Sequence, residues 1–222
     1  MSAVMETHWR AAPQQAAAPA RSVPLVFVLD GDRTVRDALA RVAGAAGWKA
    51  ETFGSAREFL AHPRPSAPSC LVLEVGLPDL NGLEMQQRLA DRPEMPIVFI
   101  SSYGDVRTAV RAMKAGAVEF FIKPLVDDML LGALHHGIER SRAELARRAD
   151  MEALRSRYAS LTCRERDILT HVVSGRLNKQ AGAELGISEI TVKAHRGKMM
   201  RKMGARCVPE LVNMAAKLFA KA

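Results

Sequence analysis

The sequence predicts an α/β domain with a parallel, doubly wound five-stranded sheet, followed by a smaller all-α domain. From Val23 to about residue 126, strongly apolar strand-like segments alternate with amphipathic helical patterns, the order that places helices on both faces of a parallel sheet. Beyond residue 158 only helical patterns follow, and glycines separate them. The charge is uneven as well: residues 1–150 are neutral, whereas residues 151–222 hold 14 Lys and Arg against 6 Asp and Glu.

The first domain is expected to contain five strands that alternate with helices. The strands correspond to residues 23–30, 48–53, 69–75, 95–101 and 117–123, and their apolar runs suit a sheet that is covered on both faces. The helices correspond to residues 33–47, 55–62, 82–91, 105–116 and 127–152, and Ser55 opens the second of them. We therefore expect this domain at residues 24–140, after an Ala- and Pro-rich tail at residues 1–23 that is expected to be disordered.

Four helices are expected in the last third of the chain, after a helical linker at residues 141–158. They correspond to residues 163–175, 178–186, 188–204 and 208–222, within a domain at residues 159–222. Thr162 precedes Glu165 at the spacing of a capping box, and Ser188 can cap the third helix. The short LGIS turn joins the middle two helices into a helix-turn-helix, whose second helix enters the DNA major groove. The positive charge of this region favours the same function.

Four polar side chains end four of the predicted strands. Asp30 ends the first, Glu74 the third, Ser101 the fourth and Lys123 the fifth. The carboxyl ends of parallel strands meet at one edge of the sheet, where ligands of such folds bind. The four side chains are therefore expected to form one site.

With the segments VLDGD, LPDLNGLE, FISSYGDV and AMKAGAVEFFIKP, these residues resemble a response-regulator receiver domain with a flavodoxin-like fold. The resemblance implies that an acidic pair after the first strand holds Mg²⁺. It also implies that the residue ending the third strand accepts a phosphoryl group from a histidine kinase, while Ser101 and Lys123 contact its oxygens. Cations at such a site offset the charge of the phosphate. Ser101 and Phe120 are the implied switch residues, which pass the change to the surface.

Two positions depart from the family pattern. Glu74 stands where the phosphoacceptor aspartate is expected, and Gly31 replaces the second acidic residue, with Asp32 one position later. Mg²⁺ binding is then left to Asp30 and Asp32 and is expected to be weak or absent, because affinity follows the number of charged ligands. We expect a receiver that works without phosphorylation, in which Glu74 approaches Lys123 as a standing negative charge. Two alternatives stay open: Glu74 is only a structural partner of Lys123, or the protein is phosphorylated at Asp30 or Asp32.

The segments LTCRERDIL, GRLNKQ and ELGISEITVKAHRGKMMRKMGAR resemble a LuxR-type DNA-binding domain of the FixJ-like response regulators, over about residues 158–220. The resemblance implies that the second helix of the helix-turn-helix reads bases through Lys193 and Ala194, with Arg196 and Gly197 nearby. A lysine can donate to guanine, and an alanine can touch the methyl group of thymine. Four further residues are assigned to phosphate contacts, which position the protein without specifying sequence: Lys179, Thr191, Arg201 and Lys202. Gly182 departs from the usual Ala and is expected to cost stability inside a helix.

The resemblance implies double-stranded DNA with an inverted repeat as the partner, bound by a homodimer that forms through the last helix. RNA polymerase is a further candidate partner. Whether a histidine kinase acts on the protein stays open. An alternative function is an interaction module that sequesters related regulators without binding DNA. Enzymatic activity is not expected, since the sequence has no nucleophile–base pair, metal-ligand cluster or phosphate-binding glycine loop. No apolar run approaches a membrane span, and the cytoplasm is the expected location.

Overall fold

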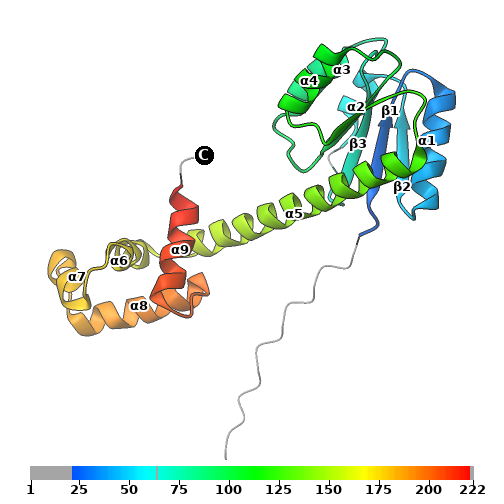
Figure 1. Cartoon of the computed structure of the whole chain (residues 1–222). Helices are drawn as coiled ribbons and strands as arrows, with labels where there is room; N and C mark the ends of the chain where they lie inside the picture. Colours follow the sequence, from blue (N-terminus) through cyan, green and yellow to red (C-terminus); the bar gives the residue numbers. More distant parts are fainter. Residues whose placement is uncertain (1–21, 64, 221–222) are drawn as a thin grey trace, which may run out of the picture. The chain divides into compact units, whose positions relative to one another are not determined.

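The computed structural model describes residues 22–63 and 65–220. Its contacts divide the chain into two compact units, with the boundary between Ile138 and Glu139. Residues 1–21 of the predicted tail lie outside the described residues. The first unit carries the sheet, and in the second the described residues form helices without strands (Figure 1).

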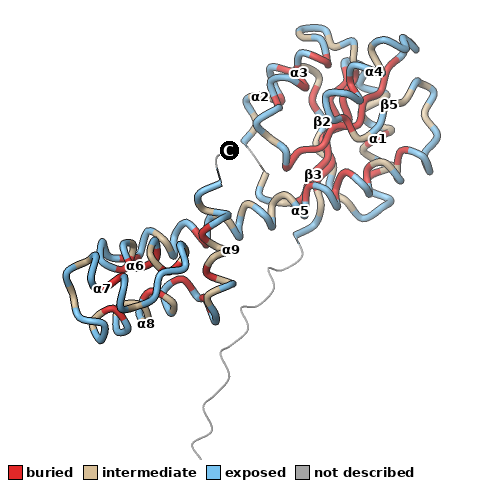
Figure 2. Tube along the Cα trace, turned by 60° about the vertical axis from the view of Figure 1, so that its left-hand side comes forward, coloured by how far each residue is buried: buried red, intermediate tan, exposed pale blue. Residues whose placement is uncertain are grey.

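The sheet of the first unit has five parallel strands in the order β2-β1-β3-β4-β5. Their bounds are β1 (Leu25–Leu29), β2 (Lys49–Phe53), β3 (Ser69–Glu74), β4 (Ile97–Ser101) and β5 (Glu119–Ile122). All residues of β1, β3 and β4 are buried, as the continuous red along β3 in Figure 2 illustrates. The central strands are buried on both faces, so the apolar runs of the sequence follow from the architecture.

Helices cover both faces of this sheet, and the side-chain alternation of the strands divides the core between them. One face packs Phe27, Leu71 and Phe99 against α2 (Ala56–Ala61), α3 (Gly82–Arg88) and α4 (Val106–Lys114). The other face packs Val28 and Val72 against α1 (Arg33–Ala45) and the first part of α5 (Asp127–Ala159). The predicted doubly wound α/β fold is therefore confirmed.

Four helices of the first unit begin at side chains that cap them. The capping residues are Asp32, Ser55, Asn81 and Asp105. The side chain of each accepts a hydrogen bond from a backbone N–H in the first turn of its helix. Such bonds satisfy donors that the helix itself leaves unpaired. Asp32, Ser55 and Asp105 each lie a few residues after a strand, so they also fix how the chain leaves the edge where the strand-end residues lie.

The second unit packs four helices after the end of α5: α6 (Cys163–Val173), α7 (Asn178–Leu185), α8 (Glu189–Met203) and α9 (Val208–Phe219). Its core consists mainly of aliphatic residues and methionines, among them Ile168, Val192, Met199 and Leu211. The predicted capping box at the start of α6 is present, with Thr162 and Glu165 bonded to each other's backbone N–H. The predicted all-α domain with a helix-turn-helix is confirmed.

Candidate functional site

The strand-end residues line one cavity of about 400 Å³ at the carboxyl edge of the sheet. Asp30, Glu74, Ser101 and Lys123 all contribute to its wall, as the alternation of strands and helices predicts. Three of the four are almost inaccessible to solvent: Asp30 is 2% exposed, Glu74 6% and Ser101 4%. The remaining lining comes from the loops that follow β1, β3 and β4 and from α1 and α4: Gly31, Asp32, Val35, Val75, Gly76, Ser102, Tyr103, Asp105 and Thr108.

Lys123 is the centre of a three-residue ion cluster in this cavity. Its Nζ donates a hydrogen bond to Oδ2 of Asp30 at 2.7 Å and lies 2.5 Å from Oε2 of Glu74. Burial alone would lower the pKa of Lys123, but the hydrogen bonds and charges of Asp30 and Glu74 outweigh it and raise the pKa. Oε1 of Glu74 accepts a hydrogen bond from the backbone N–H of Gly76. The Glu74 side chain is therefore held at both carboxylate oxygens.

The loop after β1 uses its two carboxylates to hold its own backbone. Oδ1 of Asp30 accepts the N–H of Asp32 at 2.8 Å, and Oδ1 of Asp32 accepts the N–H of Thr34 at 2.8 Å, at the start of α1. The Arg36 guanidinium donates to the carbonyls of Asp30 and Gly31. Asp32 thus serves as a helix cap, which the sequence analysis did not assign to it.

This donor set fits Mg²⁺ poorly. One cation, Lys123, already compensates Asp30 and Glu74, while Asp32 is engaged with α1 and Gly31 offers no carboxylate. Mg²⁺ needs a near-octahedral set of oxygen ligands, which here would require both the ion pair and the cap to open. Within the described part of the chain, no three His, Cys, Asp or Glu side chains are grouped so that they could hold a metal ion.

The two predicted switch residues occupy different surroundings. The Ser101 hydroxyl donates to the carbonyl of Tyr103 at 2.9 Å and accepts the Tyr103 N–H at 3.2 Å, so it closes the turn after β4. Phe120 is partly buried and stacks on Phe99, with ring centroids 6.1 Å apart. The Tyr103 side chain is 83% exposed. A change at the Ser101 hydroxyl would therefore act directly on the backbone that leads to α4.

Asp79 is a further residue of the strand-end region, and the sequence analysis missed it. Its carboxylate accepts the N–H groups of Ala56 and Arg57, both at 3.0 Å, and so caps α2 from the loop between β3 and α3. These hydrogen bonds lower the pKa of Asp79. No local pattern could reveal this role, because the partners lie 22 and 23 residues earlier in the chain.

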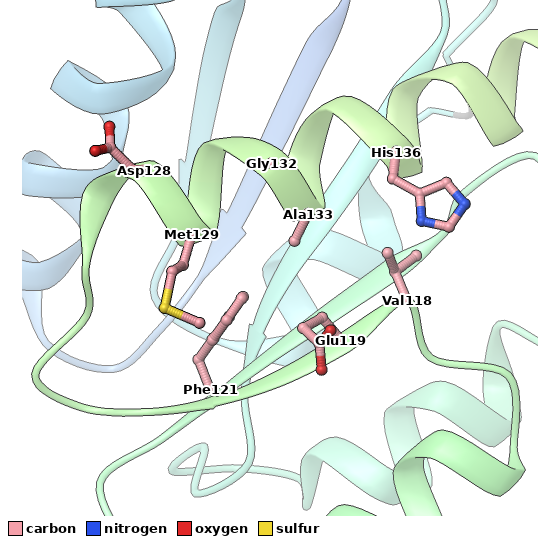
Figure 3. Close-up of a pocket in the computed structure, with 8 residues that line it drawn as sticks. All are labelled: Val118, Glu119, Phe121, Asp128, Met129, Gly132, Ala133 and His136. Atoms are coloured by element: carbon pink, nitrogen blue, oxygen red, sulfur yellow. The ribbon is translucent and has the colours of Figure 1, made fainter.

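A second cavity, of about 290 Å³, lies between β5 and α5. Figure 3 shows Met129 and Phe121 side by side, with Asp128 and His136 towards opposite ends of the helix segment. Its remaining lining residues are Val118, Glu119, Gly132 and Ala133. None of the predicted site residues contributes to it, so the strand-end cavity is the one that concentrates the predicted chemistry.

The helix-turn-helix consists of α7, a turn at residues 186–188 and α8. Gly186 ends α7 in the left-handed conformation (φ 65°), which a residue without Cβ adopts at no steric cost. Ser188 caps α8 as predicted, by accepting the N–H of Thr191. Val192, Met199 and Met203 are the buried residues of α8. Lys193, Ala194 and Lys198, which lie between Val192 and Met199 in the sequence, are exposed, whereas Met200 packs partly against the core.

The predicted DNA-contacting residues divide into two groups. Those whose side chains are exposed or only locally engaged are Lys179, Thr191, Lys193, Ala194 and Arg201, and Gly197, which has no side chain, is partly buried. Within this group, Lys193 lies 3.2 Å from Glu189, one turn earlier on α8, and both are exposed. Two others are tied to the fold. Arg196 donates to Oδ1 of Asn178 on α7 at 2.8 Å, and Lys202 donates to Oε2 of the buried Glu165 at 2.6 Å.

The ion pair between Lys202 and Glu165 gives Lys202 a structural role that the sequence analysis did not assign. Lys202 also donates to the carbonyl of Ser160, so it joins the end of α8 to the start of α6. The Lys202 ammonium and the N–H of Thr162 hold the pKa of Glu165 below its ordinary value. No local pattern in the sequence could reveal this pair, because Lys202 lies 37 residues after Glu165.

Several apolar residues of the last helix, α9, pack into the core of the second unit. Leu211 and Ala215 are fully buried in the core of the second unit, and Met214 and Leu218 are partly buried against it. Phe219 stays 56% exposed and packs edge-on against Tyr158. Inward packing therefore accounts for much of the apolar surface of α9. Within residues 22–63 and 65–220, no helix is both long and apolar enough to cross a membrane.

Comparison with known proteins assigns both units. A family model described as response regulator receiver domain matches residues 26–135, and one described as bacterial regulatory proteins, luxR family, matches residues 159–215. Response regulator protein TodT of Pseudomonas putida is 40% identical over 195 residues, which cover 87% of this chain and 86% of that protein. Nodulation protein W of Bradyrhizobium diazoefficiens is 42% identical, with the same coverage. The solved structure of response regulator StyR is 41% identical, with a TM-score of 0.79, and the match covers 88% of this chain and all of that one.

Proposed function

The chain belongs to the response regulators with a LuxR-type DNA-binding domain, and from that premise we propose that its receiver operates without an aspartyl phosphate. Members of this family are DNA-binding transcription regulators, and the chain contains both of the family's domains. The proposal concerns how the first domain communicates with its signal. In this proposal, Glu74 at the end of β3 is a permanent negative charge that takes the place of a phosphorylated aspartate.

The observation that carries the proposal is the ion cluster of Lys123, Asp30 and Glu74. Oε2 of Glu74 lies 2.5 Å from Nζ of Lys123, the group that the family resemblance assigns to a phosphoryl oxygen. A carboxylate already in that place competes with any phosphoryl group for the same ammonium. The poor fit of the loop after β1 to Mg²⁺ supports the proposal independently, since phosphoryl transfer relies on a cation to offset the developing charge.

The alternative acceptors Asp30 and Asp32 are less well suited to phosphorylation. A nucleophilic carboxylate needs a free oxygen that faces the incoming phosphorus. Asp30 is 2% exposed, with one oxygen on Lys123 and the other on the N–H of Asp32. Asp32 is exposed, but one of its oxygens caps α1. Phosphorylation at either position would break contacts that hold the loop.

For the second domain, we propose that Lys193 and Ala194 contact base edges from the exposed face of α8, with Gly197 close to the groove floor. Lys179, Thr191 and Arg201 are proposed to contact phosphates. Arg196 and Lys202 act mainly through their bonds to Asn178 and Glu165, which position α7 and α6 against α8. A homodimer on an inverted repeat is the proposed assembly, because two copies of one reading helix require two symmetric half-sites.

The receiver proposal is tested by molar mass from sedimentation, with and without Mg²⁺ plus beryllofluoride, a stable stand-in for an acyl phosphate. We expect no response from the wild type and a shift towards dimer in the double variant Glu74→Asp, Gly31→Asp. The structure accommodates the second substitution: a Cβ on Gly31 would meet only Cδ of Pro78, at 3.6 Å.

The outcomes distinguish a receiver that works without phosphorylation from one that is phosphorylated. A wild type that shifts towards dimer on its own shows that the cavity still takes phosphoryl-like ligands, and the proposal is then wrong. A double variant that stays indifferent shows that more than Glu74 and Gly31 disconnects this receiver from phosphate. Labelled phosphoryl transfer from acetyl phosphate to the wild type would reveal an acceptor at Asp30 or Asp32.

A further inference from the structure

Ile190 is a large apolar residue that the fold leaves unused. It stands in the first turn of α8 and is 80% exposed, although its neighbours in sequence Ile187 and Val192 pack into the core of the second unit. Residues two apart on an α-helix point in directions about 200° apart, so a helix that buries Val192 turns Ile190 outwards. Exposed isoleucine contributes neither to the core nor to helix propensity. The fold therefore gives no reason for an isoleucine at this position.

The position of Ile190 coincides with the proposed reading face of α8. Lys193, Ala194 and Gly197 follow it by three, four and seven residues, the spacing that places side chains on one stripe of a helix. Ile190 and Lys193 are both exposed. Residues 151–222, which include this stripe, hold the whole net charge of +8. A strongly positive surface selects a polyanion over an apolar protein partner.

We propose that Ile190 is a specificity-determining residue of this DNA-binding domain, which contacts the C5-methyl group of one thymine in the major groove. The thymine methyl is the one apolar group on a base edge there, and an aliphatic side chain is its natural partner. Isoleucine extends further from the helix than Ala194, so the two can touch different base pairs. Its β-branched side chain is stiff at χ1, and little conformational freedom is lost when it is fixed against a base.

This inference rests on the proposed base reading by α8, and the test keeps the two apart. The full-length protein first selects its preferred duplexes from a random library. Each thymine of one half-site is then replaced singly by deoxyuridine, which removes only the C5-methyl group. For wild type we expect binding to weaken about fourfold at one thymine, the value for burial of one methyl group.

The variant Ile190→Ala should bind the thymine duplex about fourfold more weakly than wild type does, and should no longer distinguish thymine from uracil at that position. Leu177→Ala is the matched control, since Leu177 is also apolar and 69% exposed but precedes α7, outside the stripe. It should keep the wild-type ratio of the two affinities.

Two results would overturn the role of Ile190. A wild type that binds every uracil-substituted duplex as tightly as the parent shows that no methyl contact exists, whatever the variant does. An Ile190→Ala protein that still loses affinity at the same thymine assigns the contact to another residue, such as Ala194. Failure of the library to yield any preferred duplex would instead contradict base reading by α8 as a whole.

Discussion

At the scale of single residues, Lys123 compensates two carboxylates that are almost without solvent. The side chains of Asp30 and Glu74 are 3% and 8% exposed, and both lie within 2.7 Å of the Lys123 ammonium. Removal of the only cation of such a cluster leaves buried charges unpaired, which costs more than the pair itself contributes. We expect Lys123→Met to lower the free energy of unfolding of the receiver by about 3 kcal/mol.

Urea unfolding followed by tryptophan fluorescence measures this change, because Trp48 packs against the core of the first unit. Lys114→Met is the control, since Lys114 is an exposed lysine at the end of α4 and should stay within about 0.5 kcal/mol of wild type. Adding Glu74→Gln to Lys123→Met should restore part of the loss. A Lys123→Met protein as stable as the control would mean that water screens the cluster.

The strand-end cavity shows how much of a site can be predicted from the sequence. The sequence predicted that Asp30, Glu74, Ser101 and Lys123 would share one edge of the sheet, because strand order and side-chain period determine where strand ends meet. It did not predict that Asp32 would cap α1, or that the Ser101 hydroxyl would bond to Tyr103. Those assignments depend on the path of short loops, for which apolar periodicity carries no information.

At the scale of elements, local signals placed the helix starts well and the long-range ties poorly. Ser55, Thr162 and Ser188 cap the helices for which they were predicted, since a cap and its partner lie within three residues. The helix ends were less accurate: the helix predicted to residue 91 ends at Arg88. Asp79 and Lys202 hold partners more than 20 residues away, which no local pattern encodes.

Gly182 is a residue whose role depends on tertiary packing and not on helix propensity. Helix propensity counts a glycine inside α7 only as a cost. In the structure, a Cβ at this position would lie 2.8 Å from the carbonyl oxygen of Ile187, in the turn that joins α7 to α8. The glycine thus permits a close approach of the turn to the helix, and the loss in propensity is offset by packing.

The link between α6 and α8 gives a prediction about pH. The Lys202 ammonium and the Thr162 N–H lower the pKa of Glu165, so its contribution is fully present above the ordinary value of 4.5 and is lost as the pH falls through the lowered one. We expect Glu165→Gln to reduce the stability of the second unit by about 1 kcal/mol at pH 7. The difference from wild type should shrink as the pH falls below 4.5.

Hydrogen exchange of the α6 and α8 amides measures this difference without interference from the receiver. The pair of Arg206 and Glu210 provides the control: the side chains are 91% and 30% exposed, against 3% for that of Glu165, so Glu210→Gln should change the stability less at pH 7. A Glu165→Gln difference that persists unchanged at pH 3 would mean that the carboxylate charge is not the source of the stabilisation.

At the scale of the whole molecule, the charge is uneven along the sequence. Residues 1–150 are neutral and residues 151–222 carry the full net charge of +8. DNA binding should therefore depend on the second unit and fall steeply with salt, since each neutralised phosphate releases counterions. For about six phosphate contacts, affinity should drop on the order of a thousandfold between about 50 and 200 mM salt.

Two lysines should divide this binding into its parts. Lys179 is exposed at the start of α7, and Lys179→Gln should weaken binding to all duplexes by the same factor and lower the slope of log affinity against log salt by about 1. Lys193 lies on the reading face of α8, so Lys193→Gln should relax the preference at one base pair by about tenfold. Fluorescence anisotropy with selected and scrambled duplexes measures both quantities.

Lys217→Gln separates these effects from a general loss of charge. Lys217 is an exposed lysine in the last turn of α9, far along the sequence from the helix-turn-helix, so its replacement should leave both the slope and the base preference unchanged. If all three variants lower affinity equally on every duplex, the charge of the second unit acts only as a diffuse attraction. The proposed sequence-specific role of α8 would then be wrong, and the protein would bind DNA without sequence specificity.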